Sequence, residues 1–241
     1  MNDTVSAEQR NTKADTSRGI IRWLIREVLG IVIVVLSLFL PAGRWDWAMG
    51  WALVAIYVIW SAANALILIP RSPELLAERA TRRKDVKSWD TMILSIIGLA
   101  TLAKHITAGL DMRFGWTPPM PPALQIAALV IAALGYALGT WAMAVNAFFS
   151  LVVRIQEDRG QVVVTGGPYR FVRHPGYVGT LAFELVTPIM LGSLWALIPG
   201  VLAALLTVVR TALEDRTLQE ELPGYAEYAQ QTRYRLLPGL W

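Results

Sequence analysis

Long, nearly uncharged hydrophobic segments constrain this chain more than any other feature of its sequence. A helix needs about 20 mostly apolar residues to cross the hydrocarbon core of a bilayer. Segments of this kind occur at residues 20–41, 47–69, 91–110, 122–145, 177–191 and 195–211. The last two are joined by a short turn at Gly192 and Ser193, which predicts a helical hairpin. The sequence therefore predicts an all-α, polytopic membrane protein of about six transmembrane helices, with five as the alternative count.

The composition agrees with a membrane protein and excludes several kinds of chemistry. Hydrophobic residues make up 55% of the chain and charged residues 17%, against about 25% charged in a soluble domain. The chain has no cysteine, which excludes disulfides, thiolate nucleophiles and cysteine-ligated metals. With only 2 histidines, we expect no metal site. We also expect no nucleic-acid partner, because an excess of basic residues in a membrane protein usually records topology.

The positions of the basic residues predict the orientation of the chain. Of the 22 basic residues, all but three fall in segments on one side of the predicted membrane. The exceptions are Arg44, Lys104 and Arg113. By the positive-inside rule both termini are expected in the cytoplasm, which requires an even number of spans. Residues 1–18 are polar and lack the apolar region of a signal peptide, so we expect a disordered cytoplasmic tail there, followed by four helices over residues 19–145.

Residues 146–179 do not have the composition of a simple connection. This stretch is dense in Gly, Pro, Arg and aromatic residues. Glycine lets the backbone approach a ligand closely, proline fixes turns, and Arg173 and His174 offer donors for a carboxylate or phosphate. The alternative interpretation is a reentrant loop whose basic residues lie at the lipid headgroups.

A second polar segment follows the last predicted span. Arg210 and Glu214 are four residues apart and therefore share one helix face, a spacing that an ordinary ion pair would also explain. The acidic pair Glu214-Asp215 is followed by a spaced set of residues that continues the pattern: Leu218, Gly224, Tyr225 and Tyr228.

These segments together, with G-P-Y-R-x-x-R-H-P-x-Y-x-G at residues 167–179 as the longest motif, resemble the isoprenylcysteine carboxyl methyltransferase family. This family is related to the phospholipid N-methyltransferases. The resemblance covers residues 146–241, which it marks as a methyltransferase motif region with a helical hairpin and a cytoplasmic tail. It implies an integral membrane methyltransferase that uses S-adenosylmethionine at a cytoplasm-facing site. No G-x-G-x-x-G fingerprint of a Rossmann domain follows a strand here.

The resemblance also implies which residues form the site. Arg210 is expected to face the substrate, and Arg173 is a second catalytic candidate. The expected cofactor-binding residues are Gln161, Val162, Val163, Val164, Tyr169, His174, Pro175, Gly176, Tyr177 and Glu214, with Arg154 and Gln156 as further candidates. The chain departs from the family pattern at Gln161, where histidine is frequent, and at Asp215, where glutamate is common.

The methyl acceptor is less constrained than the donor. A site at the bilayer boundary favours a lipidic or hydrophobic acceptor among the membrane lipids, such as a carboxylate of the isoprenylcysteine type. A phospholipid amine and a hydrophobic thiol remain open, as does a non-enzymatic transporter or scaffold.

Several other residues have a structural and a functional interpretation. Glu184 and His105 lie within spans, where ionisable residues are functional candidates, although pairing and packing explain them as well. Gly135 and Gly139 are expected to allow close helix packing. Trp45, Trp47 and Trp116 are expected in an interfacial aromatic belt.

Overall fold

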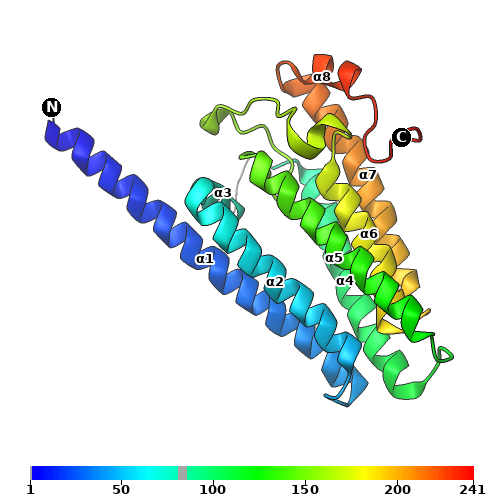
Figure 1. Cartoon of the computed structure of the whole chain (residues 1–241). Coiled ribbons are helices and arrows are strands. Elements are labelled where there is room, and N and C mark those ends of the chain that lie inside the picture. The colour runs from blue at the N-terminus through cyan, green and yellow to red at the C-terminus, as the bar shows by residue number, and fades with distance from the viewer. Residues whose placement is uncertain (1, 81–85) are drawn as a thin grey trace.

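The computed structural model describes residues 2–80 and 86–241, which form helices and loops with no strand among them (Figure 1). The helices are α1 (Asn2–Ala42), α2 (Ala48–Arg71), α3 (Pro73–Ala80), α4 (Ser88–Phe114), α5 (Pro122–Val145), α6 (Pro175–Leu191), α7 (Leu197–Glu221) and α8 (Tyr225–Gln231). Two short 3-10 turns, η1 (Glu157–Arg159) and η2 (Gly167–Arg170), lie in the connection between α5 and α6. The described part of the chain is therefore all-α, as the sequence predicts.

Five of these helices, α1, α2, α4, α5 and α7, are long and apolar enough to cross a membrane. The sixth expected span, α6, has 17 residues, about 25 Å at 1.5 Å per residue and slightly less than a hydrocarbon core of about 30 Å. The prediction of about six spans thus corresponds to five full-length helices and one shorter helix. Both ends of the described chain and the α5–α6 connection lie at the same end of the bundle (Figure 1).

The N-terminal segment differs from its prediction. The sequence predicts a disordered tail over residues 1–18, whereas helix α1 begins at Asn2 and runs without a break into the first span. The segment contains no proline or glycine before Gly19. Extending an existing helix needs no new nucleus, so polar residues of ordinary helix propensity can continue it.

Local sequence explains where α6 begins and ends. Pro175 is the first residue of α6, where its missing N–H costs no helical hydrogen bond. The helix ends at Gly192, whose φ of 80° lies in the left-handed region that glycine occupies without strain. The Ser193 hydroxyl then donates to the Asp111 carboxylate at 2.6 Å. The predicted hairpin turn between α6 and α7 is thereby attached to α4.

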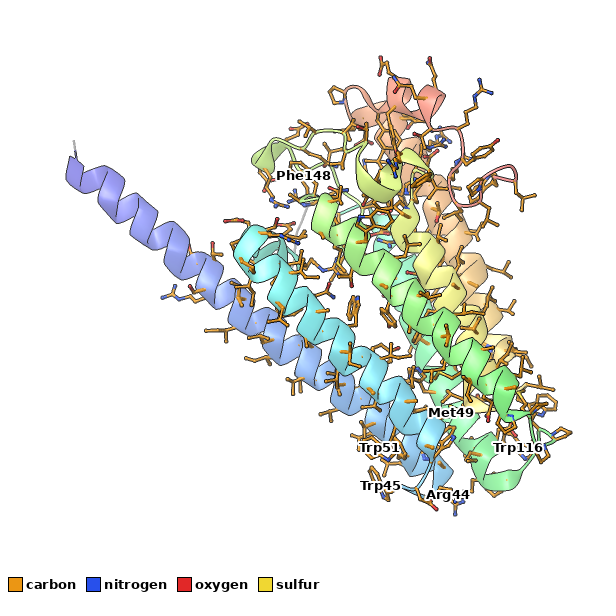
Figure 2. The ribbon with its side chains drawn as sticks, in the orientation of Figure 1. Arg44, Trp45, Met49, Trp51, Trp116 and Phe148 are labelled. Carbon is orange, nitrogen blue, oxygen red and sulfur yellow. The ribbon has the colours of Figure 1, made fainter. Side chains whose placement is uncertain are left out.

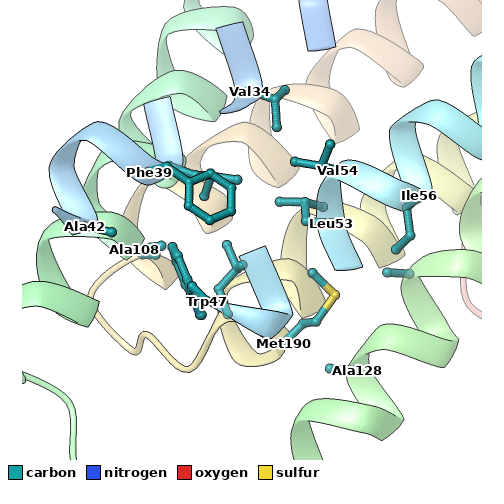
Figure 3. Close-up of a cluster of buried hydrophobic side chains, with 14 of the residues drawn as sticks. Val34, Phe39, Ala42, Trp47, Leu53, Val54, Ile56, Ala108, Ala128 and Met190 are labelled. Atoms are coloured by element: carbon teal, nitrogen blue, oxygen red, sulfur yellow. The ribbon is translucent and has the colours of Figure 1, made fainter. Parts of the chain in front are cut away.

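The largest hydrophobic core joins α1, α2, α4, α5 and α6 away from the α5–α6 connection (Figure 3). Trp47 packs edge-on against Phe39 in this core and is only 3% exposed, so its predicted place in the aromatic belt is wrong. Trp45 and Trp116 are about half exposed, as expected for the belt. Both lie at the end of the bundle opposite Phe148 and the connection (Figure 2).

Helices α5 and α6 approach each other at a pair of glycines. A Cβ atom on Gly135 would lie 2.7 Å from the carbonyl oxygen of Gly179, and one on Gly179 would lie 2.2 Å from that of Gly135. No larger residue fits at either position without moving a backbone. A Cβ atom on Gly139 would meet no atom within 4 Å. The packing prediction is therefore confirmed for Gly135, while Gly139 borders open space.

Candidate functional site

A cavity of about 370 Å³ lies between the α5–α6 connection and the helices below it. Pockets that bind small molecules commonly measure about 300–1,000 Å³. All twelve residues that the sequence predicts for the site line it, from Gln161 to Glu214. Its walls also include Trp60 of α2, Leu94 of α4, and Tyr136 and Gly139 of α5. The cavity therefore reaches from the polar connection into the interior of the helical bundle.

Arg210 lies on α7, where it is 7% exposed. Its Nε donates to Asp90 Oδ1 at 2.6 Å, and its Nη2 donates to the Leu151 carbonyl oxygen at 2.8 Å. The guanidinium carbon lies 5.2 Å from the centre of the Tyr177 ring. Its partner is therefore Asp90 at the start of α4 rather than Glu214, so the simple ion pair within one helix is excluded. Nη1 donates to no side chain or carbonyl that the structure describes.

Arg173 lies in the loop before α6 and holds the C-terminal tail. Its Nε and Nη2 donate to the two oxygens of Asp215 at 2.6 and 2.9 Å. Its Nη1 donates to the carbonyl oxygens of Thr232 and Arg233, both at 2.8 Å. Four of its five N–H donors thus hold Asp215 and the tail, which gives Arg173 a structural role, and its catalytic role stays a prediction.

Asp215 is the centre of this cluster and is fully buried. Besides Arg173, it accepts from Arg235 Nε at 2.8 Å and from the Tyr225 hydroxyl at 3.2 Å, and it lies 3.1 Å from His174 Nε2. The backbone N–H of His174 donates to the Arg235 carbonyl oxygen at 3.0 Å. One carboxylate thus orients the His174 ring at the cavity wall and attaches the tail beside it.

Glu214 is an acidic residue of α7 that lines the cavity. It accepts a hydrogen bond from the Tyr177 hydroxyl. The His174 and Tyr177 rings are stacked with their centres 5.7 Å apart. Glu214, His174 and Tyr177 therefore line one polar wall, in agreement with the sequence.

The α5–α6 connection contributes a further part of the cavity wall. The side-chain oxygen of Gln161 accepts from the backbone N–H of Gln156 at 2.7 Å. Val163 and Val164 pack against a cluster of Tyr169, Tyr225 and Tyr228, whereas Val162 is 62% exposed. The cavity also has Pro175 and Gly176 in its wall at the start of α6.

Three polar side chains around the cavity remain hydrogen-bond donors at neutral pH. Burial raises the pKa of the Tyr169 hydroxyl, and burial followed by the charge of Asp215 raises that of Tyr225. Burial raises the pKa of Tyr228 to about 12. Burial alone would lower the pKa of Arg173, but its hydrogen bonds to Asp215 raise it. The tyrosines are therefore neutral and Arg173 is charged.

Sequence reasoning missed several groups from the first half of the chain. Arg79 of α3 lines the cavity, and its Nη1 donates to the Phe149 carbonyl oxygen at 3.2 Å. Asp90 pairs with Arg210, and Glu78 pairs with Arg154 at 2.9 Å. For Asp90, the available signal was an acidic residue directly before the predicted span at residues 91–110.

Glu184 lies on the cavity wall deep in the bundle. Its Oε2 is 2.6 Å from Nζ of Lys104, which is fully buried in α4. Lys104 therefore belongs to the interior rather than to the far side of the membrane, and only Arg44 and Arg113 remain there. His105, also within a span, is 3% exposed, and its Nδ1 lies 3.4 Å from the Ser37 hydroxyl.

The fold and the cavity define a polytopic helical membrane protein with a small-molecule site at one end of its bundle. The model of the isoprenylcysteine carboxyl methyltransferase (ICMT) family matches residues 127–220, which confirms the resemblance recognised in the motifs. The chain is an integral membrane methyltransferase, as the sequence predicts.

Two curated relatives carry the name of this family. The probable protein-S-isoprenylcysteine O-methyltransferases of Oryza sativa subsp. indica and subsp. japonica are each 27% identical over 139 residues, which is 55% of this chain and 70% of theirs. A solved structure of the eukaryotic intramembrane Ras methyltransferase ICMT covers 91% of both chains at 15% identity, with a TM-score of 0.46.

Proposed function

We propose that this protein transfers a methyl group from S-adenosylmethionine to a carboxylate on a hydrophobic acceptor of the isoprenylcysteine type. The observation that carries this proposal is the set of residues that line this cavity. Glu214, Arg210 and His174 line its polar end, and Trp60 and Phe183 line its interior end. A charged donor and an acceptor with an apolar chain could therefore meet in one space.

The polar wall fits the donor. S-adenosylmethionine presents an amino group, a ribose diol, a carboxylate, an adenine ring and a sulfonium. Glu214 can accept from the amino group or the ribose, and the rings of Tyr169 and Tyr177 can pack against adenine or the sulfonium. The open space beside Gly139 leaves room for a ring at the α5 wall.

Arg210 fits an acceptor carboxylate. Asp90 and the Leu151 carbonyl oxygen hold Nε and Nη2 of its guanidinium, so the group is fixed before an acceptor arrives. Nη1 remains to donate a charge-assisted hydrogen bond to a carboxylate oxygen. Both Arg210 and Tyr177 line the cavity, so this bond would orient the acceptor toward the donor wall.

The chemistry places modest demands on the protein. S-adenosylmethionine, when bound, would supply a methyl group on a positively charged sulfur, and that sulfur would leave as a neutral thioether when an acceptor oxygen takes the methyl group. A carboxylate acceptor is already ionised at neutral pH, so the surrounding residues need to align it and exclude water rather than remove a proton. Alignment of this kind supplies up to about 7–11 kcal/mol of rate enhancement.

The proposed orientation places the cavity mouth and both termini in the cytoplasm. The support for it is that all but three basic residues fall in segments predicted on the side of the connection, which the positive-inside rule assigns to the cytoplasm. Both ends of the described chain lie at that end of the bundle (Figure 1). The donor, a soluble cytoplasmic molecule, would then enter from water.

The test is methyl transfer by the purified full chain in lipid nanodiscs, given methyl-labelled S-adenosylmethionine and an S-prenylated cysteine with a free carboxylate. We expect a labelled methyl ester. Arg210→Ala should retain donor affinity yet lose turnover by about 100-fold or more, because misplacing the acceptor by about 1 Å has this effect. Glu214→Ala should instead weaken donor binding by about tenfold or more, since it removes a charged hydrogen-bond partner.

The competing functions predict other results. Label on a phospholipid amine or a thiol, with none on the carboxylate, would replace the proposed acceptor. A transporter or scaffold would bind no donor in calorimetry. Normal turnover by Arg210→Ala would remove that residue from the acceptor site.

A further inference from the structure

The C-terminal tail exposes apolar side chains outside the spanning helices. It closes into a turn, because the backbone N–H groups of Leu236 and Leu237 donate to the Trp241 carbonyl oxygen at 3.0 and 3.1 Å. Gly239, with a φ of 83°, lets the chain reverse without strain. Leu237 is 50% exposed and Leu240 is 77% exposed. This segment, called the tail turn below, therefore presents two leucines to its surroundings.

The tail turn is fixed to the bundle by the residues before it. The backbone N–H of Arg173 donates to the Tyr234 carbonyl oxygen at 2.9 Å, directly before the start of α6. Arg235 Nε donates to Asp215 of α7 at 2.8 Å, and its guanidinium carbon lies 4.9 Å from the centre of the Trp241 ring. A segment that is already ordered loses little conformational freedom when it binds a partner.

The tail turn lies close to the end of the lipid-facing surface of α7. Val209, about half exposed, is the last of the exposed large hydrophobic side chains of this helix. Asp215, which binds Arg235 of the tail, follows six residues later, about 9 Å along the axis. The headgroup region on each side of a bilayer is about 5–8 Å thick. From α8 the tail turns back toward the bundle and ends beside α7 (Figure 1), so we infer that the tail turn lies at the level of the headgroups.

Basic and aromatic residues accompany the two leucines. Arg233 is exposed in the tail. Arg170 is also exposed, and its guanidinium carbon lies 4.6 Å from the centre of the half-exposed Phe171 ring, in the segment that leads to α6. No acidic residue occurs in residues 228–241. Anionic headgroups attract basic side chains, and aromatic rings favour the membrane interface. The charge and the apolar side chains of this surface therefore complement anionic lipid.

We propose that the tail turn binds the headgroup region of the bilayer around the protein, with Leu237 and Leu240 inserted toward the acyl chains and Arg233 paired with anionic lipid. The partner is lipid because the tail turn continues the membrane-facing surface of α7. The contact adds an anchor at the end of the bundle that carries the site.

The tail and the cavity share one charged cluster. Asp215 binds Arg235 of the tail and Arg173, and it lies 3.1 Å from Nε2 of His174, which lines the cavity. Lipid that holds the tail in place therefore also stabilises this part of the wall. By linkage, anionic lipid should raise donor affinity. This consequence rests on the proposed function, because it takes S-adenosylmethionine as the ligand of the cavity, whereas the lipid contact does not.

The first experiment measures the depth of the tail turn without any donor. The sequence has no cysteine, so Leu240→Cys in the full chain accepts a single spin label. The protein is placed in nanodiscs of mixed zwitterionic and anionic phospholipid that hold one copy each. Collisions of the label with oxygen, which partitions into lipid, are compared with collisions with a water-soluble nickel chelate. The matched control is Glu227→Cys, at an exposed position of α8.

We expect the label at position 240 to favour oxygen and the label at position 227 to favour nickel. Equal access of nickel to both labels would overturn the proposal. Protection of position 240 only in nanodiscs that hold two copies would also overturn it, because the partner would then be a second copy of the chain.

The second experiment measures donor affinity in anionic and in zwitterionic nanodiscs. We expect binding about fivefold tighter with anionic lipid, the factor that corresponds to one basic side chain at an anionic surface. Arg233→Gln should abolish most of this difference. Arg216→Gln is the matched control, because Arg216 is exposed on α7 but already paired with Glu220. An equal loss in both variants would contradict the assignment of Arg233.

The double variant Leu237→Ser, Leu240→Ser tests the inserted side chains. Both leucines are exposed, so the thermal unfolding of this variant in zwitterionic nanodiscs should match that of the wild type. Its donor affinity should no longer depend on anionic lipid. A tail with only a structural role predicts an equal fall of donor affinity in both bilayers. A protected label at position 240 in a protein that binds no donor would support the lipid contact and reject the proposed function.

Discussion

Residues 1–145 and residues 146–241 both contain buried charged side chains, but only the second region carries the motifs. The charges of the motif region find their partners in the first: Arg210 pairs with Asp90, Arg154 with Glu78, and Glu184 with Lys104. Arg173 and Asp215, by contrast, pair within the motif region. The first region is thus more than a membrane anchor, because Glu78 of α3 and two residues of α4 neutralise and orient charges of the site.

The largest effect should come from breaking a pair that joins the two regions. Asp90→Ala removes the carboxylate that holds Arg210 and the acceptor for the backbone N–H of Val153 at 2.8 Å. A buried charge left without its partner costs about 3–5 kcal/mol. We expect a loss of this size in unfolding free energy, measured by denaturant titration in detergent, together with strongly reduced methyl transfer.

Asp46→Ala is the matched control for that variant. Asp46 also pairs with an arginine, Arg44, at 2.7 Å, but both side chains are largely exposed. Exposed pairs contribute at most about 1 kcal/mol. Similar losses in Asp90→Ala and Asp46→Ala would mean that the connection between the two regions does not depend on the buried charge.

A smaller effect should follow from separating the regions at α5 and α6. Gly179→Ala places a Cβ atom 2.2 Å from the Gly135 carbonyl oxygen, so the helices must move apart. Overpacking of this kind costs about 1–3 kcal/mol, and the cavity between these helices should change shape. Thermal unfolding and donor affinity measure the two effects.

The control for this change is Gly98→Ala in α4, where an added Cβ atom meets nothing within 4 Å. Alanine is favoured over glycine inside a helix by about 1 kcal/mol, so Gly98→Ala should be neutral or stabilising. If Gly179→Ala is equally well tolerated, the close approach of α5 and α6 is not needed for the site.

The smallest effect should come from a pair inside the motif region that faces outward. Arg216 Nε donates to Glu220 at 2.7 Å, four residues further along α7, and both side chains are exposed. Solvent screens an exposed pair of this kind, so it contributes little to stability. Arg216→Ala should therefore lower the unfolding free energy much less than Asp90→Ala and leave turnover unchanged, and a loss comparable with that of Asp90→Ala would remove the distinction between the two regions.

The sequence alone was sufficient to predict the class of the protein, because apolar segments and short motifs can be recognised without knowing which residues are neighbours in the fold. Uninterrupted apolar segments predict spanning helices whatever surrounds them, since a backbone in lipid must satisfy its own hydrogen bonds. The spaced motifs of residues 146–241 identified the chemistry, and the residues predicted from them lie around one cavity. Hydropathy could not establish that residues 2–18 continue α1 or that Trp47 is buried, because both depend on neighbouring residues.

Only the tertiary structure decided what each charged residue does. Arg173 and Arg210 both stand in the motif region as arginines near acidic residues, yet Arg173 is engaged by Asp215 and the tail, while Nη1 of Arg210 donates to no described residue. Lys104 appeared in the sequence as a loop charge and proved to be the partner of Glu184. These roles arise from contacts between residues 42 to 120 positions apart. Burial makes such contacts strong, and the order of residues along the chain does not reveal which groups will meet.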